Sequence, residues 1–260
     1  MTISRIYSPD ALENKATCEL GPDNLKYIKQ VMRLKQGNKI NVFDGFGQEF
    51  EAVIKGFTPK TVFIELGKRI PLADKEIRIT LAQAIPKAGK MDTIVKSAAE
   101  LGADEIIPFD ATRSVSRIAG EKSSLKVARW QKIATEAARC CHSSHITKVS
   151  KVSSFADMLA SASGEALKLI FWEEESQKTI KDILTDKAIT AVKDFFIVVG
   201  PEGGFSKDEI IKTKEAGFIS VSLGRQILKV ETAAATILSI IQYEKGIFSK
   251  KSQEIKNDHL

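Results

Sequence analysis

The sequence contains few cysteines and no long hydrophobic segment. Of its 260 residues three are cysteines, and Cys140 and Cys141 are adjacent in the chain, so a framework of disulfides is not expected. No apolar run approaches the roughly 20 residues that a membrane-spanning helix requires. The N-terminal residues MTISRIYSPD lack the apolar core of a secretory signal. We therefore expect a cytoplasmic protein that does not bind a membrane.

The familiar signatures of nucleotide chemistry are also missing. Gly45 and Gly47 begin a dinucleotide-binding pattern, but Phe50 stands where its third glycine belongs. Gly89 and Lys90 match the end of a phosphate-binding loop, yet Met91 follows where that loop requires serine or threonine. These departures argue against hydride transfer and phosphoryl transfer.

One short segment combines cysteine with histidine. Cys140, Cys141, His142 and His145 would have to supply all the ligands of a zinc ion, which needs about four at a recognisable spacing. A helix that ends in these residues fits the sequence better, and no metal site is predicted.

The net charge of +6 is unevenly distributed along the chain. Residues 151–260 carry 15 basic and 16 acidic side chains, so the positive excess lies in the first 150 residues. It is densest from Arg113 to Lys148, where eight lysines or arginines accompany only Glu121 and Glu136. Such a stretch can neutralise nucleic-acid phosphates, although a solvated helix face would carry similar charges.

The pattern of apolar residues changes near residue 73. Before it, short apolar runs at 39–43, 50–54 and 61–66 are separated by turn residues, which predicts a small, mostly antiparallel β domain over 1–72. A helix is expected at 23–34, because Leu25, Ile28, Val31 and Met32 recur at helical spacing. Residues 251–260 are expected to form a frayed tail.

Residues 73–250 are expected to form one α/β domain. Candidate strands at 77–84, 105–109, 167–172, 195–199 and 219–223 alternate with helical patterns, as in a mainly parallel sheet covered on both faces. Amphipathic helices are predicted at 91–101 and 122–139. Trp130, within the second, is more typical of a core residue than of a platform for a nucleic-acid base.

Two loops follow predicted strands and have the composition of a ligand site. Gly200, Gly203 and Gly204 permit close approach of the backbone, and the capping pair Ser206 and Glu209 starts a helix just beyond them. The second loop, residues 223–233, places apolar side chains and cations around a glycine. Because ligands of parallel sheets bind beyond the carboxyl ends of strands, these loops predict a site for a nucleotide-like ligand.

The motifs in these loops resemble those of the RsmE-type 16S ribosomal RNA uridine-N3 methyltransferases, which belong to the SPOUT superfamily. The matching stretches are KAGKMDTIVKSAAELG at 87–102, RWQKIATEAA at 129–138, VGPEGGFSKDE at 199–209 and LGRQILKVETA at 223–233. VMRLKQG at 31–37 and the FDGFGQEF hairpin extend the resemblance over nearly the whole chain.

The resemblance implies a PUA-like β-barrel domain for RNA, followed by a SPOUT domain with a trefoil knot. The implied cofactor is S-adenosylmethionine, the implied substrate is 16S ribosomal RNA or the small ribosomal subunit, and a homodimer is expected. The candidate cofactor-binding residues are Phe171, Val199, Gly200, Pro201, Glu202, Gly203, Gly204, Leu223, Gly224, Ile227, Leu228 and Thr232.

Methyl transfer to uracil N3 requires loss of its proton and stabilisation of the resulting charge. Arg225 and Lys229 are candidates for that stabilisation, and Glu231 is a candidate base whose position at a helix start also suits a structural role. Six arginines are candidates for RNA contacts: Arg5, Arg33, Arg113, Arg117, Arg129 and Arg139.

The chain departs from the family pattern at Gln226 and Lys229, where arginines are common, at residues 139–145, and at Tyr27, where the family has histidine. Two alternatives therefore stay open. One is a methyltransferase of the same superfamily that acts on another RNA, such as a transfer RNA ribose. The other is an RNA-binding module without catalytic activity.

Overall fold

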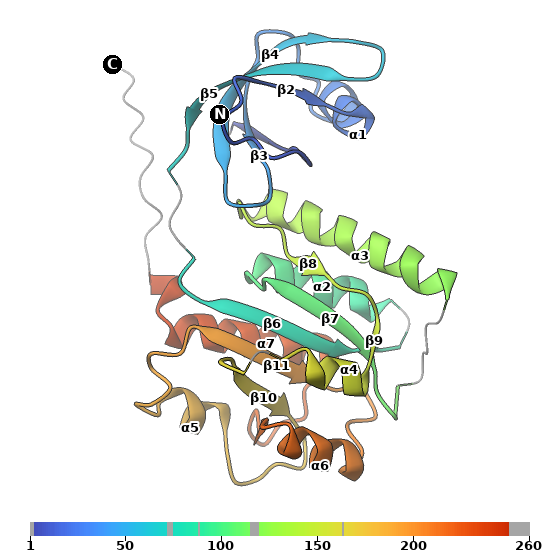
Figure 1. The fold of residues 1–260 in the computed structure, drawn as a ribbon, viewed down its shortest axis with the longest axis vertical. Coiled ribbons are helices and arrows are strands. Elements are labelled where there is room, and N and C mark those ends of the chain that lie inside the picture. The colour runs from blue at the N-terminus through green and yellow to red at the C-terminus, as the bar shows by residue number, and fades with distance from the viewer. Residues whose placement is uncertain (1–2, 72–74, 88, 115–119, 163, 250–260) are drawn as a thin grey trace. The chain divides into compact units, whose positions relative to one another are not determined.

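The computed structural model describes residues 3–71, 75–87, 89–114, 120–162 and 164–249 (Figure 1). The chain forms two compact units, of which the first comprises residues 1–75 and 132–147 and the second comprises 76–131 and 148–260. Residues 132–147 thus cluster with the N-terminal unit, although we expected them in the C-terminal domain. The expected tail at 251–260 lies outside the described residues.

The first unit is built on a five-stranded sheet in the order β1-β3-β4-β5-β2. Its elements are β1 (Ser4–Tyr7), β2 (Thr17–Leu20), α1 (Pro22–Lys26), the π-helix η1 (Tyr27–Val31), β3 (Lys39–Phe43), β4 (Glu49–Phe57) and β5 (Val62–Arg69). The sheet is mostly antiparallel, as predicted, but β1 pairs with β3 in parallel.

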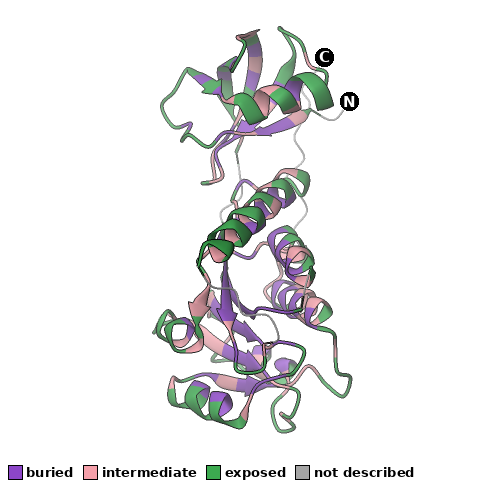
Figure 2. Cartoon of the chain, turned by 90° about the vertical axis from the view of Figure 1, so that its right-hand side faces the viewer, coloured by how far each residue is buried: buried purple, intermediate pink, exposed green. Residues whose placement is uncertain are grey.

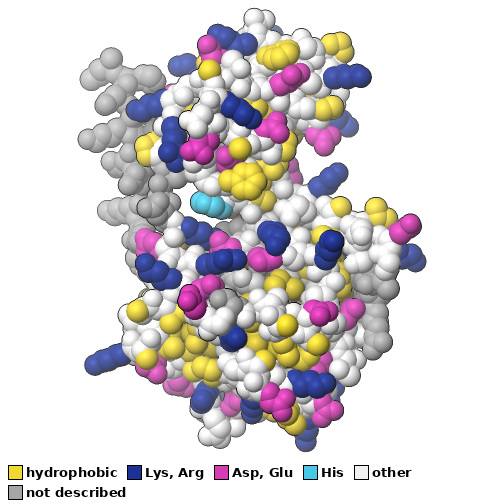
Figure 3. Space-filling view, in the orientation of Figure 1, with side chains coloured by type: hydrophobic (Ala, Val, Ile, Leu, Met, Phe, Trp, Pro, Cys, Tyr) yellow, Lys and Arg dark blue, Asp and Glu magenta, His cyan; other side chains and the backbone are white. Residues whose placement is uncertain are grey.

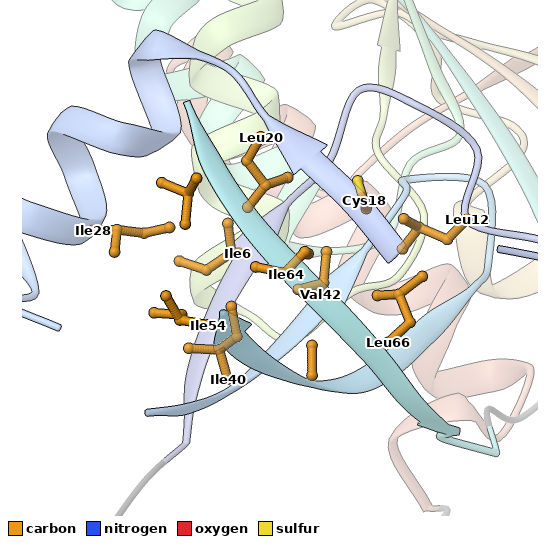
Figure 4. Close-up of a cluster of buried hydrophobic side chains, with 12 residues drawn as sticks. Ile6, Leu12, Cys18, Leu20, Ile28, Ile40, Val42, Ile54, Ile64 and Leu66 are labelled. Carbon is orange, nitrogen blue, oxygen red and sulfur yellow. The ribbon is translucent and has the colours of Figure 1, made fainter. Parts of the chain in front are cut away.

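Alternation of side chains explains how this sheet builds a core. In β5, Val62, Ile64 and Leu66 are buried while the residues between them are exposed, as the two-residue period of a strand requires. These side chains meet Ile6, Leu20 and Ile54 from other strands in one hydrophobic cluster (Figure 4). Burial of this cluster holds the small unit together.

The helix predicted at 23–34 is only partly α-helical. After Lys26 the backbone hydrogen bonds span five residues, as in a π-helix, and the amide of Met32 donates to Tyr27 O. Arg33 then adopts a positive φ of 55°, which ends the helical segment. The apolar spacing indicated a helix correctly but did not distinguish the two hydrogen-bond patterns.

The second unit contains a seven-stranded sheet in the order β12-β10-β11-β6-β7-β8, with β9 also paired to β7. Its strands are β6 (Arg78–Ala84), β7 (Glu105–Asp110), β8 (Lys148–Val149), β9 (Ser153–Ser154), β10 (Leu167–Phe171), β11 (Asp194–Val199) and β12 (Ile219–Val221). The strand pairs of this sheet, among the described residues, are all parallel. β7 and β8 lie on one side of β6, and β11, β10 and β12 lie on the other. A change of strand order of this kind marks a ligand site in parallel sheets.

Helices cover both faces of this sheet (Figures 1 and 2). They are α2 (Lys90–Glu100), α4 (Phe155–Ala160), α5 (Ile180–Leu184), α6 (Lys207–Glu215) and α7 (Val230–Glu244), followed by the 3-10 turn η2 (Ile247–Ser249). Another helix, α3 (Glu121–Cys140), begins in the second unit and continues into residues 132–140 of the first. Phe196 and Val198 of β11 pack with Met158 of α4 and Ile210 of α6. α7 packs on β11 and alongside α2. The predicted α/β class with a small, mostly antiparallel β unit before it is confirmed, whereas the knot stays a prediction.

Trp130 is a core residue, in agreement with the prediction from the sequence. It is 4% exposed, and its indole Nε1 donates to Asp92 Oδ1 at 3.1 Å. No helix among the described residues is long and apolar enough to cross a membrane.

Candidate cofactor pocket

A pocket of about 470 Å³ lies at the carboxyl ends of β10, β11 and β12. Its walls are the residues that follow these strands, together with Lys90 at the start of α2 and the first turn of α7. This volume lies within the range of small-molecule sites, which is roughly 300 to 1,000 Å³. The parallel sheet therefore brings together loops that are distant in sequence around one ligand-sized cavity.

The loop after β11 is held close to the loop after β10. Gly204 has a φ of 65°, and its amide donates to Pro201 O at 3.0 Å, which closes a tight turn. A side chain at this position would overlap the carboxylate of Glu173. At Gly200, a Cβ would approach the Phe205 ring to 3.0 Å. Backbone conformation therefore favours glycine at 204, where a side chain would also displace the Glu173 carboxylate, whereas close packing against the Phe205 ring favours it at 200.

The loop after β12 contributes the apolar part of the pocket. Ser222 and Gly224 fix its start, since the Gly224 amide donates to Ser222 Oγ at 3.1 Å and Gly224 has a φ of 102°. The pocket is lined here by Leu223, Ile227 and Leu228, with Phe171 and Val199 contributed by the neighbouring strands. Arg225 and Lys229 are exposed in the same loop. An apolar cavity with cations at its edge suits a planar ligand group beside a polar one.

An ammonium group lies between two carboxylates in the pocket region. Lys90 Nζ is 2.8 Å from Glu202 Oε1 and 3.7 Å from Glu231 Oε2. The hydrogen bond that Lys90 donates to Glu202 raises the pKa of Lys90. Burial favours a higher pKa for Glu202, but hydrogen bonds from Lys90 and the backbone outweigh it and lower that pKa. Both groups are therefore charged at neutral pH.

The structure brings most of the predicted cofactor residues together. The lining includes eleven of the twelve, from Phe171 to Leu228, while Thr232 is not part of it. Of the three candidate catalytic residues, Arg225 and Lys229 line the pocket. Glu231 does not line it but forms an ion pair with Lys90, which does.

Eight lining residues were not among the predicted site residues: Lys90, Trp172, Glu173, Val221, Ser222, Gln226, Val230 and Ala233. Trp172 and Glu173 directly follow β10, so the rule that ligands bind beyond strand ends would have found them had it been applied to that strand as well. In the sequence, Lys90 was considered only as the lysine of an incomplete phosphate-binding loop, and no role in a ligand site was predicted for it. Within the described part of the chain, the buried Trp172 Nε1 has no hydrogen-bond partner.

The candidate RNA-binding arginines have different surroundings. Arg33 and Arg113 are exposed, and Arg113 Nη1 donates to Gly203 O at 3.1 Å. Arg129 pairs with Asp92, and Arg139 pairs with Glu136 and lies over the ring of Tyr27. Arg117 lies outside the described residues. On the face in Figure 3, lysines and arginines are interspersed with acidic side chains.

Arg5 has a structural environment that removes it from the candidate RNA contacts. Only 5% of the residue is exposed, and its guanidinium pairs with Glu49 at 2.8 Å. It also donates to the backbone oxygens of Ala138 and Ser143, at 3.0 and 2.8 Å. A buried guanidinium with these partners is not available to a phosphate.

The cysteine and histidine segment follows the end of α3. Cys140 and Cys141 are exposed and neither forms a disulfide, and the Cys141 thiol donates to Ala138 O at 3.8 Å. Among the described residues, no group of three or more His, Cys, Asp or Glu side chains is arranged to hold a metal ion.

Comparison with known proteins shows how the two units are related to others. An RNA methyltransferase domain family matches residues 73–242, and an RNA methyltransferase PUA domain family matches residues 20–67. Ribosomal RNA small subunit methyltransferase E of Bacillus subtilis is 29% identical and covers 90% of this chain and 92% of its own. The protein of that name from Buchnera aphidicola of Acyrthosiphon pisum is 30% identical, with 95% of each chain covered.

Solved structures extend this similarity to the fold. The ribosomal RNA small subunit methyltransferase E of Neisseria gonorrhoeae, bound to S-adenosyl methionine, is 27% identical with a TM-score of 0.83, covering 93% of this chain and 98% of its own. A Legionella pneumophila protein in complex with the cofactor SAM is 32% identical at the same TM-score, covering 94% and 98%. The chain therefore belongs to the RNA methyltransferase family whose members include ribosomal RNA small subunit methyltransferase E.

Proposed function

We propose that this protein transfers a methyl group from S-adenosylmethionine to N3 of a uridine in 16S ribosomal RNA. The observation that carries the proposal is the position of the pocket, whose lining residues, from Lys90 to Ala233, all fall within the matched methyltransferase domain. Two relatives of the same fold were solved with this cofactor. A cytoplasmic location is part of the proposal, because ribosomal RNA would be the substrate.

The residues of the pocket suit the chemistry of this cofactor. Leu223, Ile227 and Leu228 provide apolar surface for an adenine ring. Glu173 and Glu202 supply carboxylates for the cationic amino and sulfonium groups. Gly200, Gly203 and Gly204 line the pocket without side chains, which suits contacts between their backbone groups and the ligand.

The cofactor, when bound, supplies a methyl group on a positively charged sulfur. The protein has to align the uracil with that methyl group and stabilise the negative charge that develops when N3 loses its proton. Arg225 and Lys229 are exposed beside the apolar wall, where they can donate to uracil O2 and O4. Glu231 starts α7 and is paired with Lys90, which supports a structural role over that of proton acceptor.

Analysis of the methylated nucleoside tests this proposal. The purified chain is incubated with deuterium-labelled S-adenosylmethionine and small-subunit RNA, or small subunits, that lack the modification. Mass spectrometry of the digested RNA is expected to show labelled 3-methyluridine. Label in a ribose 2′-O-methyl nucleoside would assign the enzyme another target, and absence of label from every RNA would leave an RNA-binding module.

We also propose that the chain forms a homodimer. Ile227 at the pocket and Tyr243 on α7 are 84% and 67% exposed, and apolar side chains so exposed beside a site suit a subunit interface. Sedimentation velocity is expected to give twice the chain mass of 28.6 kDa, and a species of one chain mass at micromolar concentration would refute the dimer.

A further inference from the structure

The turn between β3 and β4 presents a phenylalanine to solvent. Phe46 is 72% exposed, although Phe43, three residues earlier, is fully buried. The turn belongs to the first unit and falls within the matched PUA domain, residues 20–67. A large apolar side chain at the tip of a short turn has no role in the core of this unit.

The turn that carries Phe46 is firmly held. Asp44 is 1% exposed, and its Oδ1 accepts from the amides of Phe46 and Gln48 at 2.8 and 3.1 Å. Gly45 and Gly47 have φ values of 80° and 94°, which other residues adopt at a cost. The exposed position of Phe46 is therefore fixed by buried hydrogen bonds and two glycines.

A histidine lies next to Phe46 across a β-bridge. Phe46 and His145 are antiparallel bridge partners, an arrangement that places their side chains side by side. The Gly47 amide donates to Ser144 O at 3.1 Å, and the Ile146 amide donates to Gly45 O at 3.0 Å. A Cβ at Gly47 would lie 2.7 Å from His145 Nε2, so glycine there allows the imidazole to approach the turn.

Both rings are exposed and both belong to the first unit. We propose that Phe46 and His145 form a stacking surface for an unpaired base of RNA. Flat rings of this kind bind bases without regard to sequence, because every base has a π face. The surface is distinct from the cofactor pocket, which belongs to the second unit.

Charge favours a nucleic acid over an apolar partner. Among residues 1–75 and 132–147, lysines and arginines outnumber aspartates and glutamates by 14 to 10. A positively charged unit that carries aromatic rings matches the composition of single-strand binding surfaces. The inference rests on the proposed function only in taking RNA as the ligand.

RNA binding by the full chain tests the inference. The probes are a fluorescein-labelled 12-nucleotide single strand of mixed sequence and a blunt RNA duplex of the same length. Phe46→Ala is expected to weaken binding of the single strand about 5- to 150-fold, the range for loss of one base–aromatic stack. Phe46→Trp should retain the affinity. Phe63→Ala is the matched control, because Phe63 is also exposed, at 43%, on β5 of the same unit.

Salt dependence and strandedness separate stacking from charge. The slope of log Kd against log salt should be the same for Phe46→Ala and the wild type, since no phosphate contact is removed. The Kd for the duplex should not change. Sedimentation velocity and thermal unfolding of Phe46→Ala are expected to match the wild type.

Three results would overturn the inference: equal affinity of Phe46→Ala and wild type for the single strand, equal weakening by Phe63→Ala, or a change in oligomeric state caused by Phe46→Ala. The last would assign the two rings to a contact between copies of the chain. Failure of the proposed function is recognised separately, because a wild-type chain that transfers no methyl group refutes that function whatever the binding data show.

Discussion

At the scale of single residues, the pocket depends on two close approaches. Gly204 lies against Glu173, and Lys90 lies between Glu202 and Glu231. The contact of Gly204 with Glu173 joins the loops after β10 and β11. The ion pairs of Lys90 join the start of α2 to the loop after β11 and to the start of α7. Each makes one wall of the cavity depend on another.

Replacement of Gly204 tests the first approach. Gly204→Ala is expected to weaken binding of S-adenosylmethionine at least about tenfold, because the new methyl group overlaps Glu173 and the positive φ costs roughly 1 to 2 kcal/mol. Calorimetry measures the affinity, with Gly164→Ala as the control, because Gly164 has open space. Unchanged affinity in Gly204→Ala would contradict this account of the turn.

Replacement of Lys90 tests the ion pairs that it forms with Glu202 and Glu231. Lys90→Met removes the hydrogen bond that lowers the pKa of Glu202, so that pKa should rise. We expect kcat/KM for methyl transfer to fall about tenfold at pH 6 and its acid limb to move to higher pH. Lys90→Arg should preserve the profile. Lys96→Met, on the exposed side of the same helix, is the control. An acid limb that does not move in Lys90→Met would show that the ion pair does not affect the reaction.

At the scale of elements, the sequence predicted the strands and helices that have long regular patterns. β3 has the predicted limits, and β6, β7, β10, β11 and α2 lie within two residues of them. β8 and β9 were missed because two residues carry no periodicity, and α4 and α5 because five or six residues span little more than one helical turn.

The candidate site was predictable to the same degree. The glycine loops were identified from their own composition, since backbone freedom is visible in sequence. Lys90 and Glu173 reach the pocket from elements about 25 or more residues distant from those loops, and only the order of strands brings them there. Arg5 was misread because the local sequence does not reveal Glu49, which neutralises it in the folded unit.

The short strand β8 is held at its edge of the sheet by an ion pair. Glu105 of β7 and Lys148 of β8 are register partners, with Nζ and Oε1 at 2.8 Å, and Ser150 Oγ donates to the same oxygen at 2.5 Å. Burial favours a higher pKa for Glu105, but the hydrogen bonds from Lys148 and Ser150 outweigh it and lower that pKa.

Because the pKa of Glu105 is lowered on folding, its contribution to stability is present at neutral pH and is lost as the pH falls below the ordinary value of 4.5. Glu105→Gln is expected to lower the free energy of unfolding by about 1 kcal/mol at pH 7, a value reduced for the exposure of Lys148. Urea unfolding should show a smaller difference at pH 4. Equal differences at both pH values would assign the effect to packing alone.

At the scale of the whole molecule, the first unit combines residues from two distant parts of the chain. Arg5 of β1 donates to Glu49 of β4 and to the backbone of Ala138 and Ser143. Its guanidinium also lies 3.8 Å from the centre of the Phe43 ring. One buried cation thus attaches residues 132–147 to the sheet of residues 1–75.

Arg5→Met is expected to reduce stability by about 3 to 5 kcal/mol, because it leaves the 6% exposed Glu49 without its cation. Arg5→Met/Glu49→Leu should be much less destabilised, since the unpaired charge is gone as well. Urea unfolding with a fluorescence readout measures both variants. If Arg5→Met unfolds like the wild type but binds RNA more weakly, Arg5 is an RNA contact after all.

The central claim is that the pocket holds the methyl donor for an RNA substrate. Transfer of the labelled methyl group to unmodified small-subunit RNA, compared between the wild type and Gly204→Ala at equal protein concentration, tests it most directly. The account predicts one labelled 3-methyluridine per RNA with the wild type and a strongly reduced rate with the variant. Absence of label with the wild type, or equal rates for the two proteins, would contradict it.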